Sequence, residues 1–303
     1  MATYNNEAYL EPMLDSLLAQ TSPFSLIVSD DCSQDRTVEI LQRYEPIFEG
    51  RMRLHLQPRP SGSAKANYAV LMELSTSAHV LFADADDVWD ADKVRRTVSA
   101  LQRMEAEHGV DVPALVFSDV RLIDGAGAAK GDSYWEYKKI RPSIAQSLGG
   151  LLVCPPMLGC ATGANAALIR RSVPVPVDQV TGHDWWMMLV ANVFGHVAPM
   201  HEQTMSYRLH GNNSSDQKEV KLTSYAKAPG KMAAVRHGMD MRRLQAQALI
   251  DQFGDELPAT ARARVERFVR TEEQTFLRRR VTLLTGGYLY SDLPRNLGML
   301  ALA

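Results

Sequence analysis

Apolar residues follow helical and strand-like spacings in turn along the first part of the chain. Spacings of three and four join Leu10 to Leu18, and a short apolar run at 25–29 follows, typical of a buried strand. The same alternation continues with helices expected at 38–44, 63–74 and 94–101, and strands at 52–56, 80–83 and 114–117. Strands separated by such helices need crossover connections. The pattern therefore predicts an α/β fold with a mostly parallel sheet and helices on both faces.

The most apolar helix is expected at 183–194, directly after Gly182. It has almost no polar side, so it should be buried on nearly every face. Its single carboxylate, Asp184, lies where the helix begins. Asp184 is therefore predicted to be an N-cap, a general base, or both.

The rest of the chain divides into an irregular and a helical part. Residues 125–163 read as a long loop carrying Trp135 among polar residues, and loops of this length are usually functional. From 224 onward the spacing is helical, with apolar stripes over 232–253 and 265–276 and an apolar end at 288–303. We expect a catalytic domain over 1–217, with a donor half of about 1–120 and an acceptor half of about 121–217, and a helical region over 218–303.

Composition indicates a globular protein, and charge is unevenly distributed. The 303 residues are 46% hydrophobic and 22% charged, and three cysteines without metal-like pairing do not suggest a secreted disulfide scaffold. No secretion signal or membrane-spanning run is seen, so a cytoplasmic location is expected. Residues 218–303 carry 15 Lys and Arg against 9 Asp and Glu, a net of +6, which leaves −8 for residues 1–217. The basic region either faces an anionic partner or is a solvated helical face.

Two acidic clusters directly follow predicted strands, where parallel sheets bind ligands. Asp84, Asp86 and Asp87 can surround a hard cation such as Mg²⁺ or Mn²⁺, although an acidic turn that caps the next helix fits equally well. Asp31 can accept the imide N–H of uracil or thymine. The alternative is that Asp30 or Asp31 caps a helix that begins near 34–36.

A third polar cluster begins at His210 and continues through Gly211, Asn212 and Asn213. One imidazole nitrogen can meet a metal or a diphosphate oxygen, although a lone histidine is more often structural.

Taken in order, these motifs resemble the family 2 glycosyltransferases, most closely their rhamnosyltransferase-like bacterial members. The matching segments are Ala2–Asn5, Gln20–Thr21, Val28–Asp35, Ala64–Tyr68, Phe82–Trp89, Gly159–Cys160, His183–Trp186 and Tyr207–Asn213. Each segment is weak by itself, but together they follow the family's order from residue 2 to residue 213.

The resemblance implies a Rossmann-like nucleotide-sugar transferase fold of the A type and a role for each matching residue. Donor-side residues are Thr3, Tyr4, Asn5, Asp31, Lys65, Asp84 and Asp87. Asp86 and His210 match residues at a Mn²⁺ or Mg²⁺ ion, and Asp184 matches the catalytic base. His183, Trp185 and Trp186 fall on the acceptor side.

The reaction implied is an inverting sugar transfer from a dTDP- or UDP-linked donor to a saccharide or lipid-linked saccharide in surface polysaccharide synthesis. Rhamnose or a similar deoxyhexose is favoured, with a UDP-hexose or galactofuranose donor as the alternative. A nucleotidyltransferase or metal-dependent phosphohydrolase should carry a Gly-rich basic phosphate loop after the first strand, and none is seen. A non-catalytic binding module is disfavoured because the matching base and metal residues are intact.

No nucleic-acid partner is expected. The basic C-terminal region is predicted either to contact the inner face of the cell membrane or to form a homodimer.

The sequence departs from the family pattern in two places. Only Met1 precedes Ala2, where family members have several strand residues, so a short first strand is expected. Cys32 stands where glycine is common, and glycine tolerates left-handed backbone angles better than cysteine does.

Overall fold

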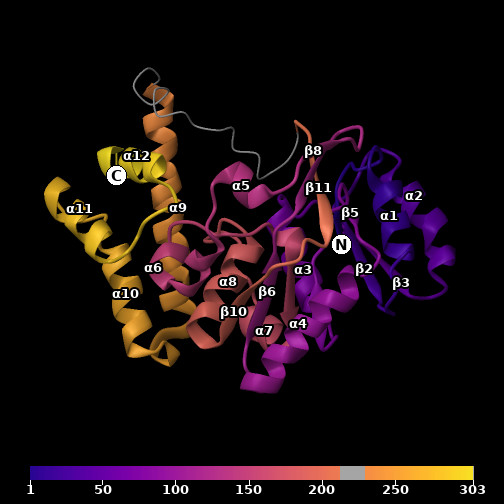
Figure 1. Cartoon of the computed structure of the whole chain (residues 1–303), viewed down its shortest axis with the longest axis horizontal. Coiled ribbons are helices and arrows are strands. Elements are labelled where there is room, and N and C mark those ends of the chain that lie inside the picture. Colours follow the sequence, from indigo (N-terminus) through magenta and orange to yellow (C-terminus); the bar gives the residue numbers. More distant parts are fainter. Residues whose placement is uncertain (212–228, 303) are drawn as a thin grey trace.

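The computed structural model describes residues 1–211 and 229–302. Figure 1 shows an α/β body built from the first part of the chain, with the C-terminal helices α9 to α12 gathered beside it. The expected boundary at 217/218 and the motif residues Asn212 and Asn213 lie outside the described residues.

The central sheet is mostly parallel, as predicted. β1 pairs in parallel with β2, β2 with β3, and Ala2 forms a parallel bridge to Asp84 just beyond β4. β9 runs antiparallel between β4 and β6, and β6 pairs in parallel with β10. The bounds are β1 Ala2–Thr3, β2 Leu26–Asp30, β3 Met52–Leu56, β4 His79–Leu81, β6 Ala114–Ser118, β9 Thr162–Asn165 and β10 His196–Met200.

The helices of this body lie where the apolar spacing predicts them. Ser63 caps α3, since its side chain accepts the N–H of Ala66. α1, α3 and α4 bury the apolar stripes that identified them. The bounds are α1 Leu10–Leu18, α2 Thr37–Tyr44, the 3₁₀ helix η1 Glu45–Phe48, α3 Ala64–Leu74 and α4 Lys93–His108.

A small mixed sheet, which the sequence did not predict, lies beside the end of β4. β11 pairs antiparallel with β5 and in parallel with β7, and β7 pairs with β8. This sheet carries Arg208 and leads into His210, so it brings residues far apart in sequence to the 84–87 turn. The bounds are β5 Val88–Trp89, β7 Arg121–Asp124, β8 Ala129–Gly131 and β11 Met205–Leu209.

The passage expected to be irregular contains several short elements, so that expectation was too simple. These elements are α5 Tyr134–Lys138, η2 Pro142–Gln146, α6 Leu148–Leu151 and η3 Gly159–Ala161, and β9 and α7 Ala166–Ser172 follow. The predicted apolar helix is α8 His183–Phe194, and residues 185–191 are all buried.

The C-terminal helices share a core with α8. Ala246, Leu249 and Phe253 of α9 belong to the same buried cluster as Trp186, and the Phe253 ring stacks on Trp186 at 5.9 Å. The predicted 265–276 stripe is divided between α10 and α11. The bounds are α9 Pro229–Phe253, η5 Gly254–Glu256, α10 Ala259–Val269, α11 Phe276–Thr285 and α12 Leu293–Leu302. Over the described ranges, no helix is both long and apolar enough to cross a membrane.

Candidate functional site

The 84–87 turn follows β4 at the edge of the central sheet, and Ala2 of β1 forms its parallel bridge to the first residue of this turn, Asp84. Asp84 accepts a hydrogen bond of 2.6 Å from the Tyr68 hydroxyl. Burial and the nearby charge of Asp86 raise the pKa of Asp84 to about 6. A positive charge bound beside Asp84 would oppose this shift in pKa.

Asp87 is fully buried with one free carboxylate oxygen. Its Oδ1 accepts the backbone N–H of Arg208 at 3.0 Å, and its Oδ2 has no hydrogen-bond partner within 1–211 and 229–302. Burial and the charge of Asp86 raise its pKa well above the ordinary value. Ligand atoms of Asp84, Asp87 and Cys160 lie within 4.8 Å of one another. The carboxylate pair fits a hard divalent cation, which would satisfy the free oxygen and relieve the repulsion.

The two residues predicted to meet a metal lie against each other. His210 Nε2 is 2.7 Å from Asp86 Oδ2, and both side chains are largely buried. The His210 ring also packs against Tyr9 at 5.0 Å. The structure thus brings Asp86 and His210 together beside the Asp84 and Asp87 carboxylates.

Arg208 belongs to the matching segment 207–213, but its structural role was not predicted from the sequence. Its Nε donates to the carbonyl of Asp86 at 2.7 Å, and its Nη1 donates to the carbonyls of Asp124 and Gly125 at 3.2 Å. Its guanidinium also lies over the Tyr9 ring. Arg208 therefore fixes the acidic turn to β11 and to the loop after β7.

Asp31 lies at the end of β2, as predicted, with a partner that was not predicted. Its Oδ1 accepts the Ser61 N–H at 2.6 Å, and its Oδ2 accepts the Ser61 hydroxyl at 2.9 Å. A nucleotide base that reaches Asp31 must share or replace these bonds.

The neighbouring donor-side residues have different environments. Thr3 is buried and donates to Asp30 Oδ1 at 3.0 Å, so its side chain is structural in this conformation. Tyr4 is 55% exposed. Asn5 adopts a φ of 51° and accepts the N–H of Gln34 at 2.8 Å.

The alternative role given to Asp30 and Asp31, capping the next helix, is wrong. Asp30 Oδ2 instead accepts the N–H of Ser33 in the turn, at 2.9 Å. α2 begins at Thr37, whose N–H is accepted by Asp35 at 2.9 Å. Cys32 adopts the left-handed angle that favours glycine, with φ of 62°.

Asp184 is the second residue of α8 and is not its N-cap, so the capping interpretation is corrected. The N-cap is Gly182, and Asp184 Oδ1 accepts the N–H of Trp185 at 2.8 Å. A Cβ added at Gly182 would lie 2.4 Å from Asp184 Oδ1, and one at Gly159 would lie 3.2 Å from Oδ2. Two glycines thus make room for this carboxylate.

Asp184 also lies near the acidic turn. Its negative charge contributes to the raised pKa of Asp84. Lys65, at the start of α3, donates to the carbonyl of Val180 at 2.6 Å and so ties α3 to the segment that leads into α8. Lys65 therefore holds the segment that precedes Asp184 in place in this conformation.

The aromatic residues expected on the acceptor side lie in the core. Trp186 is fully buried and donates to the carbonyl of Ser172 at 2.9 Å, and Trp185 donates to the carbonyl of Leu151 at 2.6 Å. His183 stacks on Tyr68 at 4.0 Å, and burial lowers its pKa to about 4. These rings hold α8 in place, and a direct contact with an acceptor is not available to the two tryptophans here.

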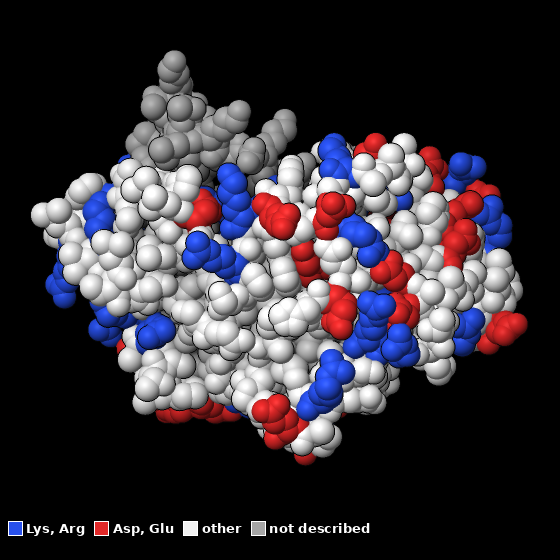
Figure 2. Space-filling view, viewed as in Figure 1, with Lys and Arg blue, Asp and Glu red and all other residues white. Residues whose placement is uncertain are grey.

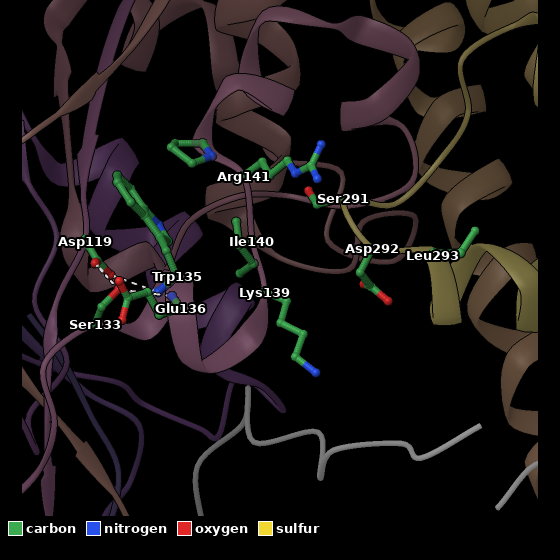
Figure 3. A pocket seen from close by; sticks show the side chains of 11 residues that line it. Asp119, Ser133, Trp135, Glu136, Lys139, Ile140, Arg141, Ser291, Asp292 and Leu293 are labelled. Carbon is green, nitrogen blue, oxygen red and sulfur yellow. Dashed lines mark hydrogen bonds between the residues drawn. The ribbon is translucent and has the colours of Figure 1, made fainter. Parts of the chain in front are cut away.

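A pocket of about 600 Å³ opens between the segment around α5 and the start of α12 (Figure 3). Its wall includes Trp135, Glu136, Lys139, Arg141, Ser291 and Leu293. The Trp135 indole donates to the carbonyl of Pro156 at 2.9 Å, in the segment that continues to Gly159 beside Asp184. The pocket therefore lies in the 121–217 part of the chain that was predicted to hold the acceptor, and the C-terminal region supplies part of its wall.

Several known proteins are similar to this chain. The model of "Glycosyl transferase family 2" matches residues 1–171. The dTDP-rhamnosyl transferase RfbG of Shigella flexneri is 30% identical over 105 residues, which are 33% of this chain and 36% of RfbG. The chain spans between 36% and 65% of the length of its first curated relatives.

Two solved structures share the fold at low sequence identity. Staphylococcus aureus TarS 1–349 in complex with UDP superposes with a TM-score of 0.56 at 16% identity, covering 91% of this chain and 71% of that one. The mannosyltransferase PcManGT of Pyrobaculum calidifontis, in complex with GDP-Man and Mn²⁺, superposes with a TM-score of 0.52 at 17% identity, covering 98% and 85%. The predicted Rossmann-like transferase fold is therefore confirmed.

Proposed function

Because the chain belongs to glycosyl transferase family 2, we propose that it transfers a sugar from a nucleoside-diphosphate donor to a saccharide acceptor, with inversion, in surface polysaccharide synthesis. The observation that carries this proposal is the placement of Asp184. A rigid, buried helix presents this one carboxylate near the Asp84 and Asp87 cluster, and two glycines leave space around it. A base opposite a leaving diphosphate is what a single in-line displacement requires.

The 84–87 turn is assigned to the donor diphosphate and a Mn²⁺ or Mg²⁺ ion. The free oxygen of Asp87 and the raised pKa of Asp84 support a cation at these carboxylates, with Asp86 and His210 beside it. When bound, the cation would offset the charge that develops on the departing diphosphate. Tyr4, Asn5 and Asp31 are assigned to the nucleotide base and ribose side.

The donor is proposed to be a dTDP- or UDP-linked sugar. Similarity to a dTDP-rhamnosyl transferase supports rhamnose or a related deoxyhexose, and the fold shared with a UDP complex keeps a UDP-hexose as the alternative. The pocket in Figure 3 is assigned to the acceptor, since Trp135 offers an aromatic face and Glu136 an exposed carboxylate for hydroxyl groups.

Replacing the proposed base tests this function. Asp184→Asn should bind dTDP- and UDP-linked sugars with Mn²⁺ as the wild type does, judged by the shift in melting temperature. It should release nucleoside diphosphate in the presence of acceptor at least about 100-fold more slowly. The matched control is Asp178→Asn, an exposed carboxylate in the segment before α8, which should retain wild-type turnover.

Unchanged turnover in Asp184→Asn would refute the assignment of the base. Release of free monophosphate without transfer to any acceptor would instead indicate a hydrolase that uses the same acidic turn.

A further inference from the structure

The C-terminal helices α11 and α12 expose an apolar face. On α11, Leu277, Val281 and Leu284 are 74%, 59% and 51% exposed, and their spacing of four and three places them on one side of the helix. The buried residues of α11, Thr282 and Leu283, lie on the other side. The helix thus packs through one side and presents a leucine and valine ridge on the other.

α12 carries a second exposed apolar ridge. Leu293 and Leu297, one turn apart, are 69% and 48% exposed, while Met299 is buried against the protein. Arg280 of α11 donates to the carbonyl of Ala301 at 3.3 Å, which joins the two helices. We call the surface formed by Leu277, Val281, Leu284, Leu293 and Leu297 the α11–α12 face.

The charges along α11 itself are all positive, and the acidic residues near the α11–α12 face lie at its ends. Asp292, beside Leu293, pairs with Arg295 at 3.1 Å, and Glu272 and Glu273 precede α11. Arg278 and Arg280 flank the α11 ridge, and the sequence has no acidic residue from Gln274 to Ser291. At the left of Figure 2, where Figure 1 places α11, the surface is mostly uncharged with Lys and Arg side chains among it. An apolar ridge flanked by arginines is typical of helices that lie in the plane of a bilayer interface.

We propose that the α11–α12 face binds the surface of an anionic lipid bilayer. Apolar side chains would enter the region between headgroups and acyl chains, and the arginines would meet lipid phosphates. A second copy of the chain fits less well, because a two-fold contact would bring the same arginines of both copies together. The inference goes beyond sugar transfer, and it can be tested without donor or acceptor.

The test is co-sedimentation of the full chain with vesicles. Wild-type protein should sediment with phosphatidylcholine and phosphatidylglycerol vesicles, and much less with phosphatidylcholine alone or at high salt. The triple variant Leu277→Ser, Val281→Ser, Leu284→Ser should partition about tenfold less or lower. Because these side chains are exposed, its thermal unfolding should match the wild type.

The matched control changes three apolar residues of the α/β body that are 48–66% exposed, Ile47→Ser, Leu56→Ser and Val110→Ser, and should bind vesicles as the wild type does. Equal sedimentation of the triple variant and the wild type with anionic vesicles would overturn the proposal. So would equal binding to neutral and anionic vesicles. A wild-type dimer that forms without lipid and is absent from the triple variant, measured by sedimentation velocity, would also overturn the proposal. It would identify a second copy of the chain as the occupant of the face.

Discussion

At the scale of single residues, the protonation state of His183 is set by the residues that surround it. His183 precedes the proposed base, yet its ring is buried between Tyr68 and Phe82 and is held neutral. Its Nε2 has no hydrogen-bond partner in the described part of the chain. A histidine in such a place makes the fold sensitive to acid.

Replacing His183 by phenylalanine should remove part of this acid sensitivity. The unfolded chain takes up a proton near pH 6.5, and the native ring only near pH 4, so acidification favours the unfolded state in that window. Between pH 7 and pH 5 the His183 contribution should lower the unfolding free energy by about 2 kcal/mol. The His183→Phe protein should lack this loss of unfolding free energy on acidification, measured by urea unfolding of both proteins at each pH. The same pH dependence in both would show that the ring is not held neutral.

At the scale of elements, α8 and the 84–87 turn are positioned by contacts that come from distant parts of the chain. Gly182 and Gly159 border the carboxylate of Asp184, and Arg208 holds the acidic turn from β11. The geometry of the site is thus set by how elements meet.

Gly182→Ala should impair transfer without unfolding the protein. The φ of Gly182 is −159°, extended backbone that alanine also adopts, so the added Cβ acts mainly by forcing the Asp184 carboxylate to move. Turnover should fall roughly ten- to hundredfold, since small misplacements of a catalytic group are costly. Donor affinity should be retained.

A double-variant cycle provides the control for Gly182→Ala. In the Asp184→Asn background, Gly182→Ala should add little further loss of turnover, because both changes act on one group. Losses that multiply would show that Gly182 acts elsewhere.

The predicted and missed elements differ in how they are stabilised. α1, α3 and β3 have apolar residues at regular spacing, so local sequence predicts them. β9, with the sequence Thr-Gly-Ala-Asn, is buried at every position and has no such signal, because its pairing with β4 and β6 defines it.

The candidate site divides in the same way. The carboxylates at strand ends, Asp184 and His210 were predicted from their place in the chain, and their roles in binding and catalysis stay predictions. The contacts of Ser61 and Arg208 were missed because their partners lie far away in sequence. Trp185 and Trp186 were assigned to the acceptor side because sequence shows their nearness to Asp184 but not their burial.

At the scale of the whole molecule, one buried cluster joins the α/β body to the C-terminal helices. Residues of α9, α10 and α12 pack in the same core as α8. Helices that follow the region matched by the family model therefore support the helix that carries Asp184.

Leu249→Ala on α9 should test whether the two regions unfold together. Leu249 is fully buried, so the substitution should cost about 2–5 kcal/mol and lower a single unfolding transition, monitored by tryptophan fluorescence. Leu244→Ala, on the same helix but partly exposed, should cost less than about 1 kcal/mol. A Leu249→Ala protein with two separated transitions would instead identify the C-terminal helices as an independent unit.

Leu293 belongs both to the wall of the pocket in Figure 3 and to the α11–α12 face. On a bilayer, the part of the pocket wall formed by Leu293 would lie close to the lipid headgroups. An acceptor anchored in the same bilayer would then meet the enzyme by lateral diffusion, already oriented. The transfer rate would then depend on the number of acceptors per unit of membrane area. Diluting the vesicle suspension with buffer would change the rate little. Diluting the acceptor within the membrane with inert lipid would lower it.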